Sequence, residues 1–313
     1  MSSPTFRETD IQKGKNMESK NVFVTIVGRP NVGKSSLLNS LVGEKIAAVS
    51  AKPQTTRTRI TGVLTKDEIQ YVFIDTPGKH RAKNKLGEHM MKTVSDAEDD
   101  AEVALLVCDC GKKLSDAERE LAAAFKSRTH VSLVLNKTDL LTKEALAERI
   151  LEYSELMDFE EVIPISVLKG EGLDIIMDYI TSKAQEGPHY FPDDSFTDQP
   201  EKVLMAEMIR EKALNCLNEE VPHGIAVTIE SLDERDTASG EPILDIAATI
   251  YCERDSHKGI VIGKRGAMLR KIGSEARADL EQFFEIKVNL DIWVKVKEGW
   301  RNKEALIKNF GLS

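Results

Sequence analysis

Residues 28–35, Gly-Arg-Pro-Asn-Val-Gly-Lys-Ser, have the residue types and spacing of a loop that binds phosphate groups. The loop follows the apolar run 22–27, which predicts a β-strand, and it opens the helical pattern 34–42. Glycines let backbone N–H groups converge on phosphates at a helix N-terminus, Lys34 can reach the β- and γ-phosphates, and the Ser35 hydroxyl can bind Mg²⁺. The expected nucleotide-binding residues of this loop are Gly28, Asn31, Val32, Gly33, Lys34, Ser35 and Ser36.

The next predicted strand is 69–74. Two residues that follow it are expected to complete the phosphate end of this site. Asp75 ends that strand, so its carboxylate can face the shell of a bound Mg²⁺ ion. Gly78 follows three residues later and has no Cβ, which allows its N–H to approach the γ-phosphate closely. The spacing therefore predicts a site for a nucleoside triphosphate and a magnesium ion.

The tetrapeptide Asn136-Lys137-Thr138-Asp139 follows the predicted strand 131–135 and addresses the base. A carboxylate at Asp139 can accept hydrogen bonds from both N1–H and the 2-amino group of guanine, which adenine cannot supply. Adenine would leave this buried charge unpaired, and that penalty gives large discrimination. The motifs favour GTP over ATP, so a P-loop ATPase or nucleotide kinase is the disfavoured alternative.

A second motif, Gly263-Lys264-Arg265-Gly266, lies between two helical patterns and carries the chemistry of RNA binding. Its glycines allow the backbone to approach a sugar-phosphate chain, and its two basic side chains supply positive charge. This is the arrangement of a KH domain, which clamps about four nucleotides. The expected RNA-binding residues are Lys258, Gly259, Ile262, Gly263, Lys264, Arg265, Gly266, Arg270 and Lys271.

The elements that must position these residues fall into two groups. In the first part of the chain, apolar strand patterns alternate with helical patterns, which predicts an α/β fold with a mostly parallel sheet and helices on both faces. The predicted strands are 22–27, 69–74, 103–108, 131–135 and 161–165. Residues 187–200 contain three prolines and few aliphatic side chains, so they predict a linker.

Beyond the linker the order changes to helix, strand, strand, helix, helix, strand, which predicts a separate α+β domain. We expect Trp293 to anchor a core at the end of the last strand, and Trp300 to be partly exposed. The expected organisation is a disordered tail (1–20), a nucleotide domain (21–186), a linker (187–200) and an RNA-binding domain (201–313).

Charge is distributed unevenly along the 313 residues, which carry 43 basic and 52 acidic side chains and a net charge of −9. Taken alone, this average argues against binding nucleic acid. However, residues 198–256 carry −9 and residues 257–310 carry +5, so the basic charge is concentrated around the G-x-x-G motif. No apolar run approaches the roughly 18 to 20 residues of a membrane helix, and we expect a cytoplasmic protein.

The motif order over 21–185 resembles that of the translation-factor-related GTPases. Within that class, the stretches 53–57 (PQTTR) and 75–87 (DTPGKHRAKNKLG) are similar to the Era family of ribosome-associated GTPases, as are 203–220 and the C-terminal LDIWVKVKEGWRN. The resemblance implies a P-loop GTPase domain followed by a type II KH domain, with GTP or GDP and Mg²⁺ bound.

The same resemblance implies a role and partners. It implies binding to the 3′ end of small-subunit (16S-type) ribosomal RNA, and a part in maturation and assembly of the 30S-type subunit. RNA is expected to stimulate GTP hydrolysis. We expect a monomer, and we leave peripheral association with the inner membrane open.

Family roles are carried over to matching positions only. Thr56 corresponds to the switch threonine that closes over Mg²⁺, with Thr55 as the alternative; the expected metal ligands are Ser35, Thr56 and Asp75. The guanine loop Ser166-Val167-Leu168 departs from the usual Ser-Ala, because Val167 adds volume near the base. The expected catalytic residues are Asn31, Lys34, Thr56, Asp75 and Gly78.

Lys79 occupies the position where Ras-like enzymes carry a water-orienting glutamine. Intrinsic turnover is therefore expected to be slow, on the order of 10⁻⁴ to 10⁻² s⁻¹. Asn31 is a candidate to hold a K⁺ ion beside the phosphates, as in related enzymes without that glutamine. Lys79 and Val167 also leave open an RNA-binding assembly chaperone with weak or vestigial GTPase activity.

Overall fold

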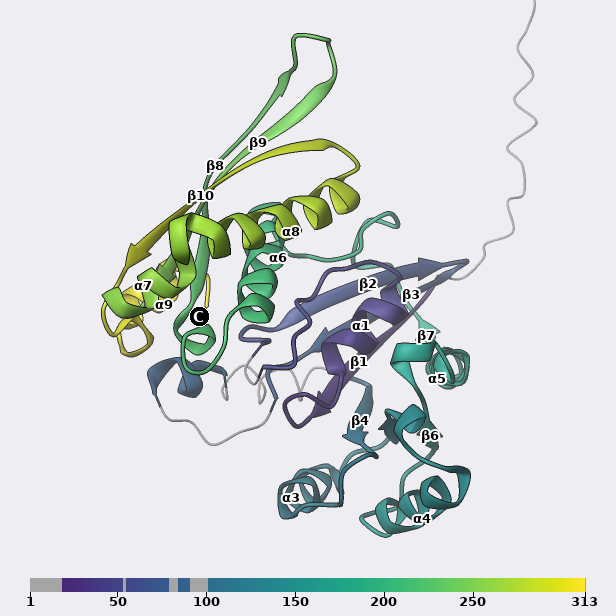
Figure 1. Cartoon of the computed structure of the whole chain (residues 1–313). Coiled ribbons are helices and arrows are strands. Elements are labelled where there is room, and N and C mark those ends of the chain that lie inside the picture. Colours follow the sequence, from purple (N-terminus) through teal and green to yellow (C-terminus); the bar gives the residue numbers. More distant parts are fainter. Residues whose placement is uncertain (1–18, 53–54, 79–83, 91–100, 313) are drawn as a thin grey trace, which may run out of the picture.

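A computed structural model describes residues 19–52, 55–78, 84–90 and 101–312. Apart from its last two residues, the predicted tail 1–20 lies outside the described residues, as do Pro53, Gln54 and Lys79. The first strand already includes Lys20. Figure 1 shows two groups of elements: the first holds the larger sheet, and the second, coloured green to yellow, holds a smaller sheet backed by helices.

The first domain contains a sheet with the strand order β2-β3-β1-β4-β5-β6, in which β2 is antiparallel to β3 and the remaining neighbours are parallel. A two-residue strand, β7, pairs with the start of β1. The predicted α/β class is confirmed. The strands are β1 (Lys20–Gly28), β2 (Ile60–Lys66), β3 (Ile69–Asp75), β4 (Val103–Asp109), β5 (Val131–Asn136), β6 (Val162–Pro164) and β7 (Gln185–Glu186).

Helices cover both faces of this sheet. Helices α1 (Lys34–Val42) and α5 (Leu173–Thr181) share a core with the inward side chains of β1 and β3. Helices α3 (Asp116–Phe125) and α4 (Lys143–Ser154) pack on the other face, against β4 and β5. Both strand faces are therefore apolar, which explains why the strands read as continuous hydrophobic runs rather than alternating ones.

Strand β2 was not among the predicted strands, because a glycine interrupts its short apolar pattern. A Cβ on Gly62 would lie 2.6 Å from Leu38 Cδ1 and 2.9 Å from Ile46 Cδ1. The missing side chain thus allows α1 to lie close to this strand. Glycine in a strand weakens the sequence signal, and here it marks tight packing of a helix on the sheet.

The second domain has the predicted order of a type II KH fold. Its elements are α6 (Glu201–Cys216), β8 (Ala226–Asp236), β9 (Pro242–Cys252), α7 (Asp255–Ile262), α8 (Ala267–Phe284), β10 (Lys287–Val296) and a short α9 (Glu304–Asn309). Strand β9 is central, antiparallel to β8 and parallel to β10. Helices α6 and α8 share a core with one face of this sheet, and the β8–β9 hairpin projects away from the body (Figure 1).

Both tryptophan predictions were wrong. Trp293 is 63% exposed, because β10 alternates and turns Val288, Leu290 and Ile292 inward instead. Trp300 is fully buried and its indole N–H donates to the carbonyl of Gly224 (2.9 Å). Trp300 belongs to a small core that joins Leu86 and Met90 of the first domain to residues of the second.

The predicted linker follows the edge of the first sheet, held by hydrogen bonds. Gln70 on β3 is fully buried; its Oε1 accepts from the backbone N–H groups of Tyr190 (2.7 Å) and Phe191 (3.0 Å), and its Nε2 donates to the Phe191 carbonyl (2.9 Å). Thr197 adds a bond from its hydroxyl to the Thr61 carbonyl (2.6 Å). The segment is therefore anchored, and the ranges 21–186 and 201–313 remain our proposed domains on either side of it.

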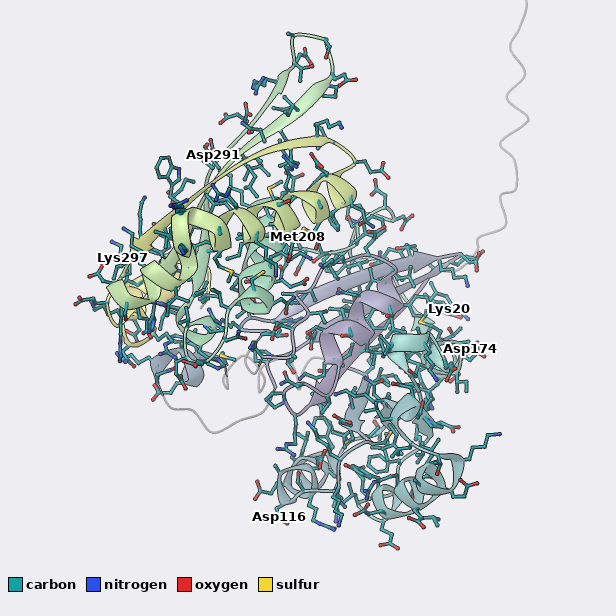
Figure 2. The ribbon with its side chains drawn as sticks, in the orientation of Figure 1. Lys20, Asp116, Asp174, Met208, Asp291 and Lys297 are labelled. Atoms are coloured by element: carbon teal, nitrogen blue, oxygen red, sulfur yellow. The ribbon has the colours of Figure 1, made fainter. Side chains whose placement is uncertain are left out.

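In Figure 2, Asp116 and Asp174 mark helices α3 and α5 of the first domain, and Asp291 and Lys297 mark β10 and the residue after it in the second. Met208 lies on α6, which the ribbon places between α8 and the first domain. Helix α6 is thus positioned to contact both domains.

Replacing Gln70 by Ala removes three hydrogen bonds that hold the linker. We expect a loss of about 2–3 kcal/mol in the free energy of unfolding and faster cleavage within residues 187–200 in limited proteolysis. Gln282→Ala, at an exposed position on α8, serves as the control. Unchanged proteolysis of the Gln70→Ala variant would show that the linker is held by other contacts.

Candidate functional site

The phosphate loop connects β1 to α1 and is compressed from two sides. Gly33 has a left-handed φ of 103°, and a Cβ there would lie 2.3 Å from Asn136 Nδ2. A Cβ on Gly78 would lie 2.6 Å from the backbone nitrogen of Pro30. These two glycines let the base motif, through Asn136, and the segment after β3 touch the phosphate loop directly.

Lys34 is buried beneath the loop. Its ammonium donates to the carbonyls of Gly28 and Arg29, both at 3.2 Å. Burial lowers the pKa of Lys34, and the nearby Asp75 carboxylate opposes that shift by favouring the charged form. The loop therefore closes around a cation that faces the position where phosphate groups would bind.

Three oxygen-bearing side chains from three separate segments meet beside Lys34. Ser35 Oγ lies 2.6 Å from Asp75 Oδ2 and 2.7 Å from Thr56 Oγ1. Asp75 is fully buried, and its second oxygen, Oδ1, has no hydrogen-bond partner among the described residues. Burial raises the pKa of Asp75, whereas Lys34 and the Ser35 hydroxyl lower it. A buried, partly unpaired carboxylate with two hydroxyls fits Mg²⁺, which prefers oxygen ligands.

The two candidate switch threonines point to different partners. Thr56 directs its hydroxyl at Ser35, whereas Thr55 donates its hydroxyl to the Lys52 carbonyl (2.7 Å). This geometry favours Thr56 as the metal ligand. The phosphate pocket is lined by Pro30, Asn31, Gly33, Lys34, Ser35, Ser36, Ala48, Val49, Ser50, Thr55, Thr56 and Gly78.

A larger cavity of about 530 Å³ adjoins the phosphate pocket and shares Gly33, Ser36 and Val49 with it. Its remaining lining residues are Asn39, Ser40, Asn136, Lys137, Asp139, Leu140, Val167 and Leu168. The motif predicted to read the base and the loop after β6 therefore lie on one cavity, next to the phosphate loop.

Asn136 ties the base motif to its neighbours. Its Nδ2 donates to the Val32 carbonyl (2.8 Å), and its Oδ1 accepts from the Val167 N–H (3.2 Å). Lys137 donates to the Asn31 carbonyl (2.8 Å) and to Asp109 (2.7 Å). These bonds hold the base motif against the phosphate loop. The N–H of Val167 is taken up by Asn136, and Val167 also forms part of the cavity wall.

Asp139 is oriented by Ser166, whose hydroxyl donates to Asp139 Oδ1 at 2.6 Å. Ser166, predicted to bind the nucleotide, does not line the cavity itself and instead holds the carboxylate. A carboxylate fixed at this edge can accept the two guanine hydrogen bonds described above. Leu168 is 87% exposed at the same cavity.

Several cavity residues were missed from the sequence. Asn39 and Ser40 lie three and four residues after Ser36, so one face of α1 lines the base cavity. That helical periodicity was a readable signal. Val49 carried none, because it lies in an irregular segment whose path depends on contacts with the second domain.

The candidate RNA groove lies between α8 and β10 and has a volume of about 550 Å³. Gly263 and Gly266, with φ of 71° and 76°, form the turn before α8, and Lys264 and Arg265 are exposed on that turn. Gly266 and Arg270, two of the predicted RNA-binding residues, line the groove, whereas Gly263, Lys264 and Arg265 lie on the adjoining turn and do not. The other lining residues are Leu269, Gly273, Ser274, Arg277, Asn289, Leu290 and Ile292.

Other predicted RNA contacts lie away from the groove lining. Lys258, Gly259 and Ile262 belong to α7, and a Cβ on Gly259 would meet nothing within 4 Å, so no close backbone approach requires that glycine. Lys271 lies 3.9 Å from Glu275 on α8. The missed Gly273 and Ser274 follow the helical period from Gly266 and Arg270, as does Arg277, so one more turn of the pattern would have found them.

The fold and these two sites define a guanine-specific P-loop GTPase joined to a KH domain. A family model described as a 50S ribosome-binding GTPase matches residues 23–137, and one described as a KH domain matches residues 220–301. The chain is 51% identical over 294 residues to GTPase Era of Clostridioides difficile (strain 630), which covers 93% of this chain and 98% of the relative. The chain belongs to the Era family of GTPases.

A second relative and two solved structures agree with this assignment. GTPase Era of Ruminiclostridium cellulolyticum is 47% identical, covering 94% of this chain and 98% of that relative. A crystal structure of Era in complex with MgGDPNP and nucleotides 1506–1542 of 16S ribosomal RNA matches with a TM-score of 0.88 and 36% identity, covering 94% of this chain and 99% of that one. A variant of Aquifex aeolicus Era bound to GDP·AlF4⁻ gives the same values.

We expect Asp139→Asn to change the preferred base. An asparagine amide can still accept from N1–H, but it presents N–H to the 2-amino group of guanine. GTP affinity should therefore fall by about 100-fold or more, while xanthosine triphosphate, which carries a carbonyl at that position, should bind better than to the unaltered chain. Competition binding with both nucleotides measures this.

Asp174→Asn, an exposed change in the first turn of α5, is the matched control and should leave base preference unchanged. Unaltered GTP affinity in Asp139→Asn would remove Asp139 from base recognition.

Proposed function

We propose that this chain is a GTP-hydrolysing switch that binds the 3′ end of 16S-type ribosomal RNA and assists maturation of the small ribosomal subunit. The convergence of Ser35, Thr56 and Asp75 beside the cavity that Asp139 lines is the observation that carries the GTPase part. The groove between α8 and β10, with Arg270 and Arg277, supports the RNA part. A relative was crystallised with a 16S fragment, which favours the small subunit over the 50S subunit named in the first family model.

The residues act on GTP through position and charge. Magnesium, when bound, would neutralise charge on the β- and γ-phosphates, held by the Ser35 and Thr56 hydroxyls and by Asp75. Lys34 would stabilise negative charge on the phosphates from below, and the Gly78 N–H would approach the γ-phosphate. Water attacks phosphorus, the bond to the bridging oxygen breaks, and GDP and phosphate are released.

Thr56 connects the nucleotide state to the rest of the chain. With Mg²⁺ and a γ-phosphate bound, Thr56 would be supported by them on one side and by its own segment on the other, so hydrolysis would remove one of its two supports. We propose that release of this segment changes the presentation of the RNA groove.

None of the helices in the described part of the chain has the length and apolar character of a membrane span. We further propose that the protein is a cytoplasmic monomer with peripheral membrane contact.

Asn31 is our proposed K⁺ ligand. It adopts a left-handed φ of 65°, lines the phosphate pocket, and donates from Nδ2 to the Ala51 carbonyl (2.8 Å). That bond places an amide oxygen and a backbone carbonyl in the same neighbourhood, and both are oxygen ligands of the kind that K⁺ takes.

GTP hydrolysis should be several-fold faster in KCl than in NaCl at equal ionic strength, because K⁺ is more weakly hydrated than Na⁺ and exchanges its water more readily for amide and carbonyl oxygens. Asn31→Ala should hydrolyse GTP equally slowly in both salts. Phosphate release under single-turnover conditions measures the rates, with Lys34→Ala as the inactive control. Equal rates of the unaltered chain in the two salts would remove the K⁺ proposal.

The double variant Lys264→Ala/Arg265→Ala should weaken binding of single-stranded RNA from the small-subunit 3′ end. Losing two phosphate contacts should flatten the dependence of log K on log salt by about 1.4. Lys126→Ala/Lys143→Ala removes the same two charges from exposed positions on the nucleotide domain and is the matched control. An equal effect of this control would contradict the placement of the RNA site, and fluorescence anisotropy across a salt series measures both.

A further inference from the structure

The segment that lines the nucleotide cavities also forms the contact with the second domain. Glu211 on α6 accepts from the Val49 N–H with one oxygen (2.8 Å) and from the Lys45 ammonium with the other (2.7 Å). Lys45 also bonds Asp279 on α8 (2.5 Å). The loop that lines the nucleotide cavities is therefore held by side chains of the KH domain.

Arg210, one residue before Glu211, makes the most deeply buried of these contacts. It is 1% exposed, and its Nε donates to Glu207 Oε1 at 2.7 Å. Its Nη2 donates to Glu207 Oε2 and to the backbone carbonyl of Thr55. Glu207 lies one helical turn earlier, so the pair fixes the plane of the guanidinium, and the guanidinium in turn fixes the Thr55 carbonyl.

Arg57 holds the other end of the tripeptide Thr55-Thr56-Arg57. It is 3% exposed and donates to the carbonyls of Ile225 (2.5 Å) and His223 (3.1 Å) in the second domain. Its guanidinium lies 5.6 Å from the centre of the Trp300 ring. Burial, followed by repulsion from Arg210, lowers the pKa of Arg57 to about 9. The free-energy cost of burying a charged guanidinium is tolerated only where the surrounding contacts hold the side chain firmly.

Thr56 therefore lies between two residues that are both fixed to the second domain. The Thr55 carbonyl and the Thr56 N–H belong to one planar peptide, so fixing the first orients the second and the residue that carries it. In this orientation the Thr56 hydroxyl lies 2.7 Å from Ser35, at the proposed magnesium site.

We propose that Arg210 is a positioning residue for the Mg²⁺·GTP state. It holds Thr56 in the closed position through the Thr55 carbonyl, so the KH domain supplies part of the nucleotide site. This inference rests on the proposed GTPase function and adds to it a residue outside the nucleotide domain. By linkage, Mg²⁺·GTP must then stabilise the docking of α6 to the same extent.

The affinity ratio between a non-hydrolysable GTP analogue and GDP, both with Mg²⁺, tests the proposal in the full chain. Arg210→Met keeps an unbranched apolar stem but has no group that donates a hydrogen bond. It should lower analogue affinity by about 5- to 150-fold and leave GDP affinity unchanged, because Thr56 is needed only with a γ-phosphate. Arg210→Lys restores one charged donor and should recover part of the ratio.

Lys85→Ala is the control at the same interface. It removes an exposed interdomain ion pair with Glu304 (3.9 Å) without touching Thr55, and should keep the unaltered ratio. Equal loss of analogue and GDP affinity in Arg210→Met, or no loss of either, overturns the proposal. If thermal denaturation shows that Arg210→Met is not folded, Glu207→Ala replaces it in the test, because it removes the partner that fixes the guanidinium of Arg210. A reduced affinity ratio in Glu207→Ala supports the proposal, and an unaltered ratio overturns it.

The ratio is a binding measurement and does not require turnover. Absence of phosphate release from GTP by the unaltered chain would contradict the proposed GTPase function, whereas the ratio in Arg210→Met would still report on the position of Thr56.

Discussion

The burial of one carboxylate constrains the arrangement of the whole nucleotide domain. Asp75 ends β3 in a position without solvent, where a charge is tolerated only if cations or hydroxyls surround it. The parallel pairing of β1 and β3 places Asp75 opposite Ile26, two residues before the phosphate loop begins. Ser35 then arrives from the start of α1, and Thr56 from the segment before β2. Sheet order, loop and switch all meet at this carboxylate.

The second domain combines two opposite electrostatic demands. Arg270 and Arg277 line the groove proposed to attract RNA, while the β8–β9 hairpin carries acidic residues such as Asp233 and Asp236 along its exposed length. The average charge of the chain therefore misleads, because the sign that matters is that of a single surface. Acidic surfaces such as this hairpin disfavour the orientations that bring RNA against them.

The motif residues and most strands could be predicted from sequence because their signals are local. The phosphate loop, Asp75 and the base motif each sit directly after a buried strand, and strand ends at one edge of a parallel sheet meet in space. The turn before α8 was found for a similar reason. Strand β2 was lost to a glycine that serves helix packing, and Trp293 was misplaced because the alternation of β10 was not followed to that residue.

The contacts between domains had no local signal. Arg210 and Thr55 are 155 positions apart, and each looks ordinary in its own segment: an arginine on a helix and a threonine in a loop. The buried state of Trp300 likewise depends on where the first domain lies, since part of its core comes from Leu86 and Met90. Such features follow from how two folded units are placed, which composition and periodicity do not encode.

The anchored linker limits how these units can move. Gln70 and Thr61 anchor the linker as far along the chain as Thr197, and the Gln199 amide donates to the Arg59 carbonyl (3.3 Å). Helix α6 then begins at Glu201. Only a few bonds around Pro200 are left to act as a pivot, so the second domain can swing about one point but cannot drift away. Its effective concentration at the switch therefore stays high, and a broken contact can re-form within the same molecule at any dilution.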